Sequence, residues 1–369
     1  MLDFTSALYL DMRHPHATLA PWQQLTTGHP AAFESSPAEE QAAQAIAQLL
    51  GCEQAVLGAS TLHIFWDLFH SLSQDHISVY LDDGTYPIVR WAVAQVATNR
   101  VPVMGFRKHD VAALEYRLTH SPHPARRPVV VCDGLDPASG RPAPLERYLA
   151  LVKAVGGYLV IDDTQALGVL GQRPSTTIPY GTGGGGTAAW YGLRDPALII
   201  GASLAKGFGV PIAVLAGSQP CLARLTRDSL IRVHCSPPSA ATWAATNHAL
   251  GMNERRGDWL RKRLLQNVRR FRDVLVQAGL RVDGGFFPVQ TPRLGTQAQQ
   301  IHERLQAEGI RTVLHRERGG SPAQLSFLIN AAQTPQDIDH AAERLAAITT
   351  HNVPQRGRKV RNHGQVTGL

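Results

Sequence analysis

The chain has 369 residues, of which 44% are hydrophobic, and it carries a formal net charge of +7. A chain of this length can bury a large core, so neither disulfides nor metal ions are needed to stabilise it. No apolar run is long enough to cross a membrane, and the first thirty residues lack the apolar centre of a signal peptide. These features predict a soluble cytoplasmic protein with one large domain and one smaller domain.

The four cysteines are far apart in the sequence and form no C-x-x-C pair. This spacing predicts buried thiols and argues against a disulfide framework or a zinc site. We therefore expect no metal ion and a reducing compartment.

Basic residues gather in two segments, at 255–272 and in a tail at 356–361. A basic surface of this kind suits nucleic acid, coenzyme A or an acidic carrier protein. No nucleic-acid-binding motif accompanies the charge, so we expect no nucleic-acid partner. A solvated helix face and a disordered tail would give the same pattern.

Residues 1–35 contain apolar and aromatic residues without a clear period, which indicates an N-terminal arm. The sequence from Ser36 to Glu39 has the pattern of a capping box, in which the Ser36 hydroxyl accepts from the Glu39 amide and the Glu39 carboxylate reaches back. A helix is predicted from there to Leu50, and Gly51 ends it.

Between residues 55 and 161, short strand-like runs alternate with helix-like segments. The alternation predicts a mostly parallel sheet with helices on both faces, and ligands beyond the carboxyl ends of the strands. The predicted strands are 55–57, 78–81, 101–104, 129–132 and 158–161, and the predicted helices are 61–72 and segments that begin at residues 87, 111 and 145.

The alternation stops at residues 172–194, which are rich in Ser, Thr, Pro and Gly. Gly181 to Gly186 formally fits G-x-G-x-x-G, but no strand precedes it and no acidic residue follows at the distance that a dinucleotide site requires. The segment is interpreted as a flexible loop, one that could move over a substrate.

The second half of the chain predicts a helix at 220–231 and a long helix from Pro237 to Ala278. Further elements follow in the order strand, helix, strand, strand, helix, at 281–289, 296–308, 311–314, 325–328 and 335–348. We therefore divide the chain into an N-terminal arm (1–35), a large domain (36–235), a small C-terminal domain (236–350) and a basic, flexible tail (351–369).

Lys206 lies between two strand-like runs, on a turn of small residues within 198–218. Burial on such an apolar turn lowers the pKa of an ammonium group and leaves a neutral amine, which can form a Schiff base with an aldehyde. A lysine whose head group reaches the surface from a loop would show the same local pattern.

Asp162 stands at the exit of the predicted strand 158–161. A Schiff-base lysine and an aspartate that keeps a pyridine nitrogen protonated are two requirements of pyridoxal 5'-phosphate (PLP). A helix cap or a turn would also place an aspartate here. Together, Asp162 and Lys206 make PLP the predicted cofactor.

Other residues at predicted strand ends suit the same cofactor. Ser60 and Thr61, at the start of a predicted helix, offer hydroxyls and free amides to a phosphate, and Ser203 offers another hydroxyl. Tyr86 can stack on a flat ring. Each of these residues would also suit a turn or the core, so their joint placement carries the argument.

Four stretches of the chain resemble one enzyme family. They run from Asp133 to Leu145, from Ile161 to Gly171, from Ser203 to Gly209 and from Cys235 to Pro238. The chain is similar to the fold-type I PLP enzymes and, within them, to the α-oxoamine synthases, the group of 8-amino-7-oxononanoate synthase and glycine C-acetyltransferase. The resemblance covers residues 1–348. It implies an α/β, aspartate-aminotransferase-like large domain with a mostly parallel sheet and a smaller α+β C-terminal domain.

The resemblance also implies roles for the candidate residues. Lys206 would hold the cofactor as a Schiff base, and Asp162 would pair with its ring nitrogen. Ser203, Ser60 and Thr61 would hold the phosphate.

Tyr86 falls where the family stacks a histidine on the ring, and Asp133 joins the cofactor-binding residues that the resemblance implies. Members of the family are homodimers with active sites at the subunit interface. The segment from His234 to Ser236 is therefore expected to reach the cofactor of the partner subunit.

The chain also departs from the family pattern. Gln165 replaces the histidine of an Asp-x-x-His motif, so this position can hydrogen-bond to the phenolic oxygen of the cofactor but cannot shuttle a proton. Ser326 replaces the arginine that grips the carboxylate of the amino acid, which shifts that task to Arg316 or Arg318 or removes it. The Gly-Ser-Gly stretch of the family is replaced by residues 28–34.

The sequence leaves several functions open. The first is a PLP-dependent acyltransferase that joins an amino acid to an acyl thioester of coenzyme A or a carrier protein, with Lys206, Asp162 and Gln165 as catalytic residues. The second is an aminotransferase acting on an amine or a carrier-bound carbonyl compound in specialised metabolism. A non-catalytic binding protein is the third, and a serine nucleophile in Ser203-x-x-Lys206 is the fourth, although the partner motifs of that chemistry are missing.

Overall fold

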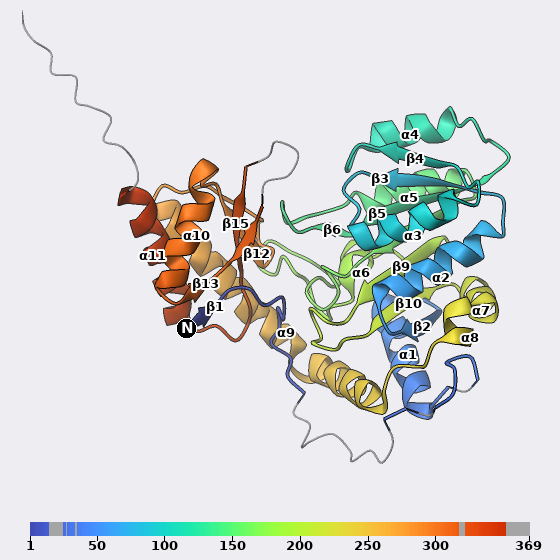
Figure 1. The fold of residues 1–369 in the computed structure, drawn as a ribbon, viewed down its shortest axis with the longest axis horizontal. Coiled ribbons are helices and arrows are strands. Elements are labelled where there is room, and N and C mark those ends of the chain that lie inside the picture. Colours follow the sequence, from blue (N-terminus) through green and yellow to red (C-terminus); the bar gives the residue numbers. More distant parts are fainter. Residues whose placement is uncertain (15–24, 27, 34, 317–321, 352–369) are drawn as a thin grey trace, which may run out of the picture.

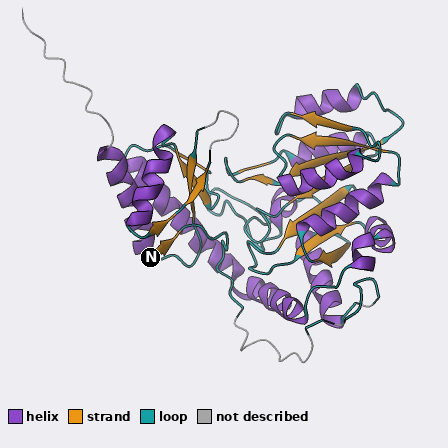
Figure 2. Cartoon of the chain, in the orientation of Figure 1, coloured by secondary structure: helices purple, strands orange, loops and turns teal. Residues whose placement is uncertain are grey.

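A computed structural model describes residues 1–14, 25–26, 28–33, 35–316 and 322–351. Two lobes, each built on its own sheet, are connected by one long helix, α9 (Ala240–Gln277) (Figure 1). The cartoon in Figure 2 shows helices packed around both sheets. The predicted basic tail, apart from residue 351 at the end of the last helix, lies outside the described residues.

The larger lobe contains a seven-stranded sheet in the order β2-β10-β9-β8-β5-β3-β4. Strand β10 runs antiparallel to both of its neighbours, and the other neighbouring pairs are parallel. The carboxyl ends of all the strands except β10 therefore point to one edge. The strands are β2 (Gln54–Gly58), β3 (Ile77–Asp82), β4 (Val103–Phe106), β5 (Arg127–Asp133), β8 (Tyr158–Asp162), β9 (Leu198–Ser203) and β10 (Ala213–Gly217).

Helices cover both faces of this sheet, as the alternating pattern predicted. Within β5, the side chains of Val129 and Val131 belong to one core cluster with helices α2, α3 and α7, whereas Val130 and Cys132 belong to another with α4 and α5. The helices are α1 (Pro37–Leu50), α2 (Thr61–Ser73), α3 (Pro87–Ala97), α4 (Val111–Thr119), α5 (Leu145–Ala154), α6 (Gly186–Tyr191), α7 (Gln219–Asp228) and α8 (Leu230–His234).

The predicted capping box at α1 is half present. The Ser36 hydroxyl accepts from the Glu39 amide at 3.2 Å. The Glu39 carboxylate faces the guanidinium of Arg232, with 3.7 Å between Oε1 and Nη1. The serine therefore satisfies a free amide of the first turn, while the glutamate links α1 to α8.

The smaller lobe contains a four-stranded sheet in the order β11-β12-β15-β14, packed against helices. The predicted strand at 281–289 is wrong, because Gly284 (φ 113°) and Gly285 (φ 55°) turn the chain between two short strands. The elements are β11 (Val282–Asp283), β12 (Val289–Pro292), α10 (Ala298–Ala307), β13 (Ile310–Arg311), β14 (Val313–His315), β15 (Gln324–Leu328) and α11 (Pro335–His351).

The start of the chain is not a free arm. Strand β1 (Leu2–Asp3) pairs in parallel with β13. Phe4 packs against Phe327 with ring centroids 5.6 Å apart, and Tyr9 and Leu10 are fully buried. Phe4, Tyr9, Leu10 and Met12 are therefore part of the buried core, which the irregular spacing of the apolar residues in this segment did not reveal.

The glycine run at 181–186 is largely packed inside the protein, so this part of the segment 172–194 is not an open loop over a substrate. Gly184 and Gly186 are buried, and α6 begins at Gly186 with its first amides near the carboxylate of Asp163. A Cβ atom on Gly186 would lie 1.9 Å from Asp163 Oδ2. Close approach to Asp163 thus explains this glycine, and no dinucleotide is needed to do so.

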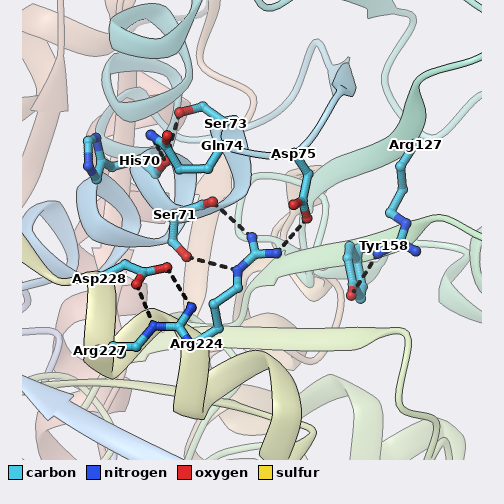
Figure 3. A network of polar contacts seen from close by, with 10 residues as sticks. All are labelled: His70, Ser71, Ser73, Gln74, Asp75, Arg127, Tyr158, Arg224, Arg227 and Asp228. Carbon is cyan, nitrogen blue, oxygen red and sulfur yellow. Dashed lines mark hydrogen bonds and ion pairs between the residues drawn. The ribbon is translucent and has the colours of Figure 1, made fainter.

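Polar contacts line the amino-terminal edge of the large sheet (Figure 3). Arg224 of α7 donates to the carbonyl of Ser71 at 2.8 Å and forms an ion pair with Asp75. Arg127 at the start of β5 donates to the Tyr158 hydroxyl at 3.2 Å. The residues predicted to bind the cofactor lie at the opposite, carboxyl edge of the sheet. None of the helices in the described ranges is long and apolar enough to cross a bilayer.

We predict that Gly186→Ala destabilises the protein far more than Gly192→Ala. Both glycines have a positive φ, of 83° and 70°, but Gly192 has open space where a Cβ would lie. The strained backbone alone costs about 1 kcal/mol, and the contact with Asp163 adds about 1 to 3 kcal/mol for Gly186→Ala. Urea denaturation measures both losses, and equal losses would contradict the packing role of Gly186.

Candidate functional site

The strand register brings the predicted acidic residues and the lysine turn together. Asp133 at the end of β5 lies opposite Asp162 at the end of β8, and Asp162 lies opposite Gly201 of β9. Strand β9 ends at Ser203, and Lys206 follows on the next turn. Three neighbouring parallel strands therefore deliver two carboxylates and one amine to the same edge of the sheet.

Lys206 is held on a tightly packed turn. A Cβ on Gly207 would lie 2.3 Å from the carbonyl oxygen of Leu167, and one on Gly209 would lie 2.5 Å from the carbonyl oxygen of Met12. Burial lowers the pKa of Lys206, while the charges of Asp162 and Asp133 raise it, and the lowering prevails. The predicted turn is confirmed, and its lysine is shifted toward the neutral amine that Schiff-base chemistry requires.

Asp162 is 6% exposed, and its Oδ1 accepts from the Thr164 amide at 3.0 Å. Burial raises its pKa, against the lowering effect of the hydrogen bonds from Thr164 and the charge of Lys206. A buried carboxylate of this kind gains most from a cationic partner. A protonated ring nitrogen would be such a partner.

Asp133 accepts a hydrogen bond from the backbone amide of Tyr86, with 3.0 Å between N and Oδ1. Burial and the nearby charge of Asp162 raise the pKa of Asp133. The side chain of Tyr86 is 54% exposed at the start of α3. It is therefore no core aromatic, and its ring is available to stack on a ligand.

Ser60 and Thr61 occupy the N-terminus of α2. Ser60 is the N-cap residue, and its hydroxyl contacts Nδ1 of His63 at 2.9 Å. Ser203 accepts from the amide of Ala205 at 3.2 Å. The three hydroxyls sit beside free amides of a helix start and a turn, which is the chemistry that binds phosphate.

Gln165 lies on the turn after β8, three residues beyond Asp162. Its Oε1 accepts from the hydroxyl of Tyr9 at 2.9 Å. Sequence reasoning missed Tyr9, because the contact joins residues that are 156 positions apart and no local pattern marks it.

Two predicted positions are not joined to this cluster by any contact among the described residues. Ser236 is exposed on the link between α8 and α9. Ser326, where the resemblance expects an arginine, lies on β15 and is buried. Its hydroxyl contacts the Thr291 hydroxyl at 2.7 Å and Nε2 of His315 at 3.1 Å. The small lobe thus offers an uncharged cluster at this position.

The set of side chains suits a phosphorylated pyridine aldehyde. An amine with a lowered pKa can bond to the aldehyde carbon, and a buried carboxylate can pair with the ring nitrogen. The hydroxyls and amides at the start of α2 suit the phosphate. This donor set defines a PLP-type site at the carboxyl edge of a mostly parallel sheet.

The sequence profile of the family "aminotransferase class I and II" matches residues 1–345. The chain therefore belongs to this family, and the predicted fold class is confirmed.

Relatives in sequence agree with the motifs. The 8-amino-7-oxononanoate synthase of Nitrosococcus oceani is 29% identical over 249 residues, which are 66% of this chain and 62% of that protein. The chain thus spans about three fifths of the length of this relative. The synthase of Serratia proteamaculans is 26% identical over 365 residues, or 94% of this chain and 89% of that protein.

Solved structures share the fold. A serine palmitoyltransferase of Sphingomonas wittichii has a TM-score of 0.82 at 17% identity, covering 95% of this chain and 88% of that one. The 8-amino-7-oxononanoate synthase of Francisella tularensis has a TM-score of 0.73 at 17% identity, covering 95% and 98%. The resemblance to the α-oxoamine synthases that the motifs predicted is therefore confirmed.

We predict that Asp133→Asn stabilises the cofactor-free protein at alkaline pH. Folding raises the pKa of Asp133 above its value in the unfolded chain, so the free energy of unfolding falls as the pH rises through the folded pKa. The variant lacks this pH-dependent loss. Its free energy of unfolding should exceed that of the wild type by about 1 kcal/mol or more above neutral pH, and should equal it near pH 4.

Thermal unfolding from pH 4 to 9, on protein purified without PLP, measures this difference. The exposed Asp83, varied to asparagine, serves as the control and should follow the wild type. A gain for Asp133→Asn that is independent of pH would contradict the prediction.

Proposed function

We propose that the protein is a PLP-dependent acyltransferase of the α-oxoamine synthase type, which condenses an amino acid with an acyl thioester. The observation that carries this proposal is the Lys206 amine, with its lowered pKa, beside the buried Asp162 at the carboxyl edge of the sheet. The family of the chain and the names of its relatives in sequence support it.

The proposal assigns a task to each of the candidate residues. Lys206 would hold PLP through the aldehyde carbon, and once the amine of the amino acid has taken its place on that carbon, the freed Nζ atom of Lys206 would accept or return a proton. Asp162 keeps the ring nitrogen protonated, while Ser60, Thr61 and Ser203 bind the phosphate oxygens. PLP, when bound, supplies an electron sink for the carbon of the amino acid that gains negative charge.

Asp133 and Tyr86 complete the cofactor site in the proposal. Asp133 holds the start of α3 through the Tyr86 amide, which keeps the exposed Tyr86 ring over the edge of the sheet. Gln165 donates from its amide to the phenolic oxygen of the cofactor.

An aminotransferase is the second candidate, and the small-lobe cluster of Ser326, Thr291 and His315 favours it. Burial lowers the pKa of His315, so at neutral pH this cluster carries no positive charge. Such a cluster suits an amine or an ester better than the free carboxylate of an ordinary amino acid. Conversion of bound PLP to its amine form by an amino donor, without release of thiol from a thioester, would distinguish this function.

The proposal includes a homodimer. Residues 233, 234 and 236 are exposed, and no contact within the described chain joins them to the turn of Lys206. An exposed segment before a long helix is free to enter the site of a second subunit, as the resemblance implies. We retain the proposed division into an N-terminal segment, a large domain and a small domain, with the boundary between the two domains at residue 235.

We propose a cytoplasmic location on the ground that all four cysteines are unpaired. Free thiols persist in a reducing compartment.

The thioester carrier is proposed to dock on α9. Arg255, Arg256 and Lys262 are exposed there around Trp259, whose ring is 53% exposed and lies 5.9 Å from the Arg256 guanidinium. These three cations make no ion pair within the described chain. A basic face with an aromatic centre suits the phosphates of coenzyme A or an acidic carrier protein.

We predict that Lys206→Ala abolishes both thiol release from acyl thioesters and the visible absorbance of bound PLP. Asp162→Asn should retain PLP but lower kcat by about 100-fold to 1,000-fold, because the ring nitrogen loses its ionic partner. A panel of amino acids with acyl-coenzyme A, followed by a thiol assay, measures both effects. Wild-type protein that binds PLP but releases no thiol with any pair would refute the acyltransferase and leave the aminotransferase.

We predict that the triple change of Arg255, Arg256 and Lys262 to glutamate raises the KM for the acyl thioester about tenfold and leaves the KM for the amino acid unchanged. Loss of surface attraction acts on the charged substrate alone, and added salt should raise the wild-type KM in the same way. The exposed Arg147 on α5, varied to glutamate, is the matched control. An unchanged KM in the triple variant would exclude this docking face.

A further inference from the structure

Gln165 is the residue on the β8 turn whose chemistry depends on how its side chain is oriented. A primary amide has one end that accepts and one end that donates hydrogen bonds, and the two have nearly the same shape. At neutral pH the amide carries no charge that would select one orientation. A neighbouring residue has to decide which end faces the cofactor site.

Tyr9 provides that selection. Its hydroxyl contacts Oε1 of Gln165 at 2.9 Å, and no other acceptor for this hydroxyl lies within hydrogen-bond distance in the described chain. Burial raises the pKa of Tyr9 well above its usual value, so the hydroxyl keeps its proton. A protonated, buried hydroxyl must donate its proton, and the amide oxygen is the acceptor that is present.

The Tyr9 ring is itself fixed by the small lobe. It is 1% exposed and packs edge to face on Phe287, with ring centroids 5.4 Å apart. Its backbone carbonyl accepts from the amide of Ala331 at 2.9 Å. The small lobe therefore holds the phenol in place, and the phenol holds the amide oxygen of Gln165.

The other end of the Gln165 amide is its Nε2 group, which donates hydrogen bonds. With Oε1 engaged by Tyr9, the Nε2 group of Gln165 is turned away from Tyr9, and no hydrogen-bond acceptor for it is present among the described residues. Gln165 is partly exposed on the turn that begins at Asp162. On the side that faces away from Tyr9, the Gln165 amide thus presents only its N–H donors.

We propose that Tyr9 is a positioning residue that turns the amide of Gln165 so that only its N–H groups face the cofactor. This inference rests on the proposed PLP site but not on which substrates the enzyme uses. A donor held beside the phenolic oxygen stabilises its ionised form. Tyr9 therefore influences the protonation of the cofactor through Gln165, without contacting the cofactor itself.

The test follows the visible absorbance of the PLP-bound protein as a function of pH. In Tyr9→Phe the ring and its packing on Phe287 remain, but the amide is no longer oriented, and we expect the midpoint of the spectral transition to rise by about one pH unit. Gln165→Leu removes the donor and should raise the midpoint at least as much. In the double variant, Tyr9→Phe should add no further shift.

Tyr180→Phe is the matched control. Tyr180 is also a buried tyrosine, and its hydroxyl donates to the carbonyl of Phe286 and not to Gln165. This variant should lose stability but keep the wild-type midpoint. Thermal unfolding of every variant checks that the fold is intact. Gln165→Glu, which keeps Tyr9 intact, gives a second measurement, and its acceptor-only carboxylate should also raise the midpoint.

Three results would overturn the proposal. One is a wild-type midpoint in Tyr9→Phe combined with a shifted one in Gln165→Leu, and another is a Tyr9→Phe shift that is just as large in the Gln165→Leu background. The third is a wild-type midpoint in Gln165→Glu. Failure of the wild type to bind PLP at all would instead refute the proposed function, so the two failures are distinguishable.

Discussion

The structure depends on how two carboxylates and one amine are held together out of water. An isolated charge in a protein interior is unfavourable. It persists there when a group of opposite charge, from the protein or from a ligand, lies next to it. Here the parallel register of β5 and β8 sets Asp133 opposite Asp162, and the turn after β9 brings in Lys206. Burial shifts the pKa of each toward its neutral form. The buried Asp162 carboxylate would therefore gain from the protonated ring nitrogen of PLP, and the Lys206 amine is shifted toward the form that bonds to an aldehyde.

The N-terminal segment connects the two lobes at this site. Residues 1–12 contribute to the small-lobe core, yet Tyr9 reaches Gln165 on the turn after β8. His14 contacts the carbonyl of Phe208, two residues beyond Lys206, at 2.8 Å, and Nδ1 of His248 on α9 at 3.0 Å. Both turns that carry the candidate catalytic residues are thus held by the same short segment. A change in the packing of the small lobe would be transmitted to both turns.

Two of the departures from the family pattern, at Gln165 and Ser326, share one physical feature. At Gln165 an amide replaces an imidazole, and at Ser326 a hydroxyl cluster replaces a guanidinium, so in each case a group that can be cationic is replaced by a neutral one. The amide keeps hydrogen-bonding ability and gains a fixed orientation through Tyr9. The hydroxyl of Ser326 is already engaged by Thr291 and His315. In the proposed function, the site keeps the groups that would bind PLP, while a neutral cluster stands where the resemblance implies an arginine.

The sequence by itself predicted most elements of the large lobe and placed Lys206 and Asp162 at the ends of its strands. Interactions between residues that are close in sequence decide these features. Their signals are the strand and helix periods, a serine cap at α1, and acidic or small residues at the ends of strands. It also predicted Ser60, Thr61, Ser203 and Tyr86 at the correct edge, because parallel strands share that edge. Only the tertiary structure decided that Phe4 and Tyr9 are core, that Gly186 packs on Asp163, and that Tyr9 meets Gln165. These contacts join residues that are far apart in the sequence. They depend on three-dimensional packing, so the sequence around neither residue of a pair shows a periodic pattern that would predict the contact.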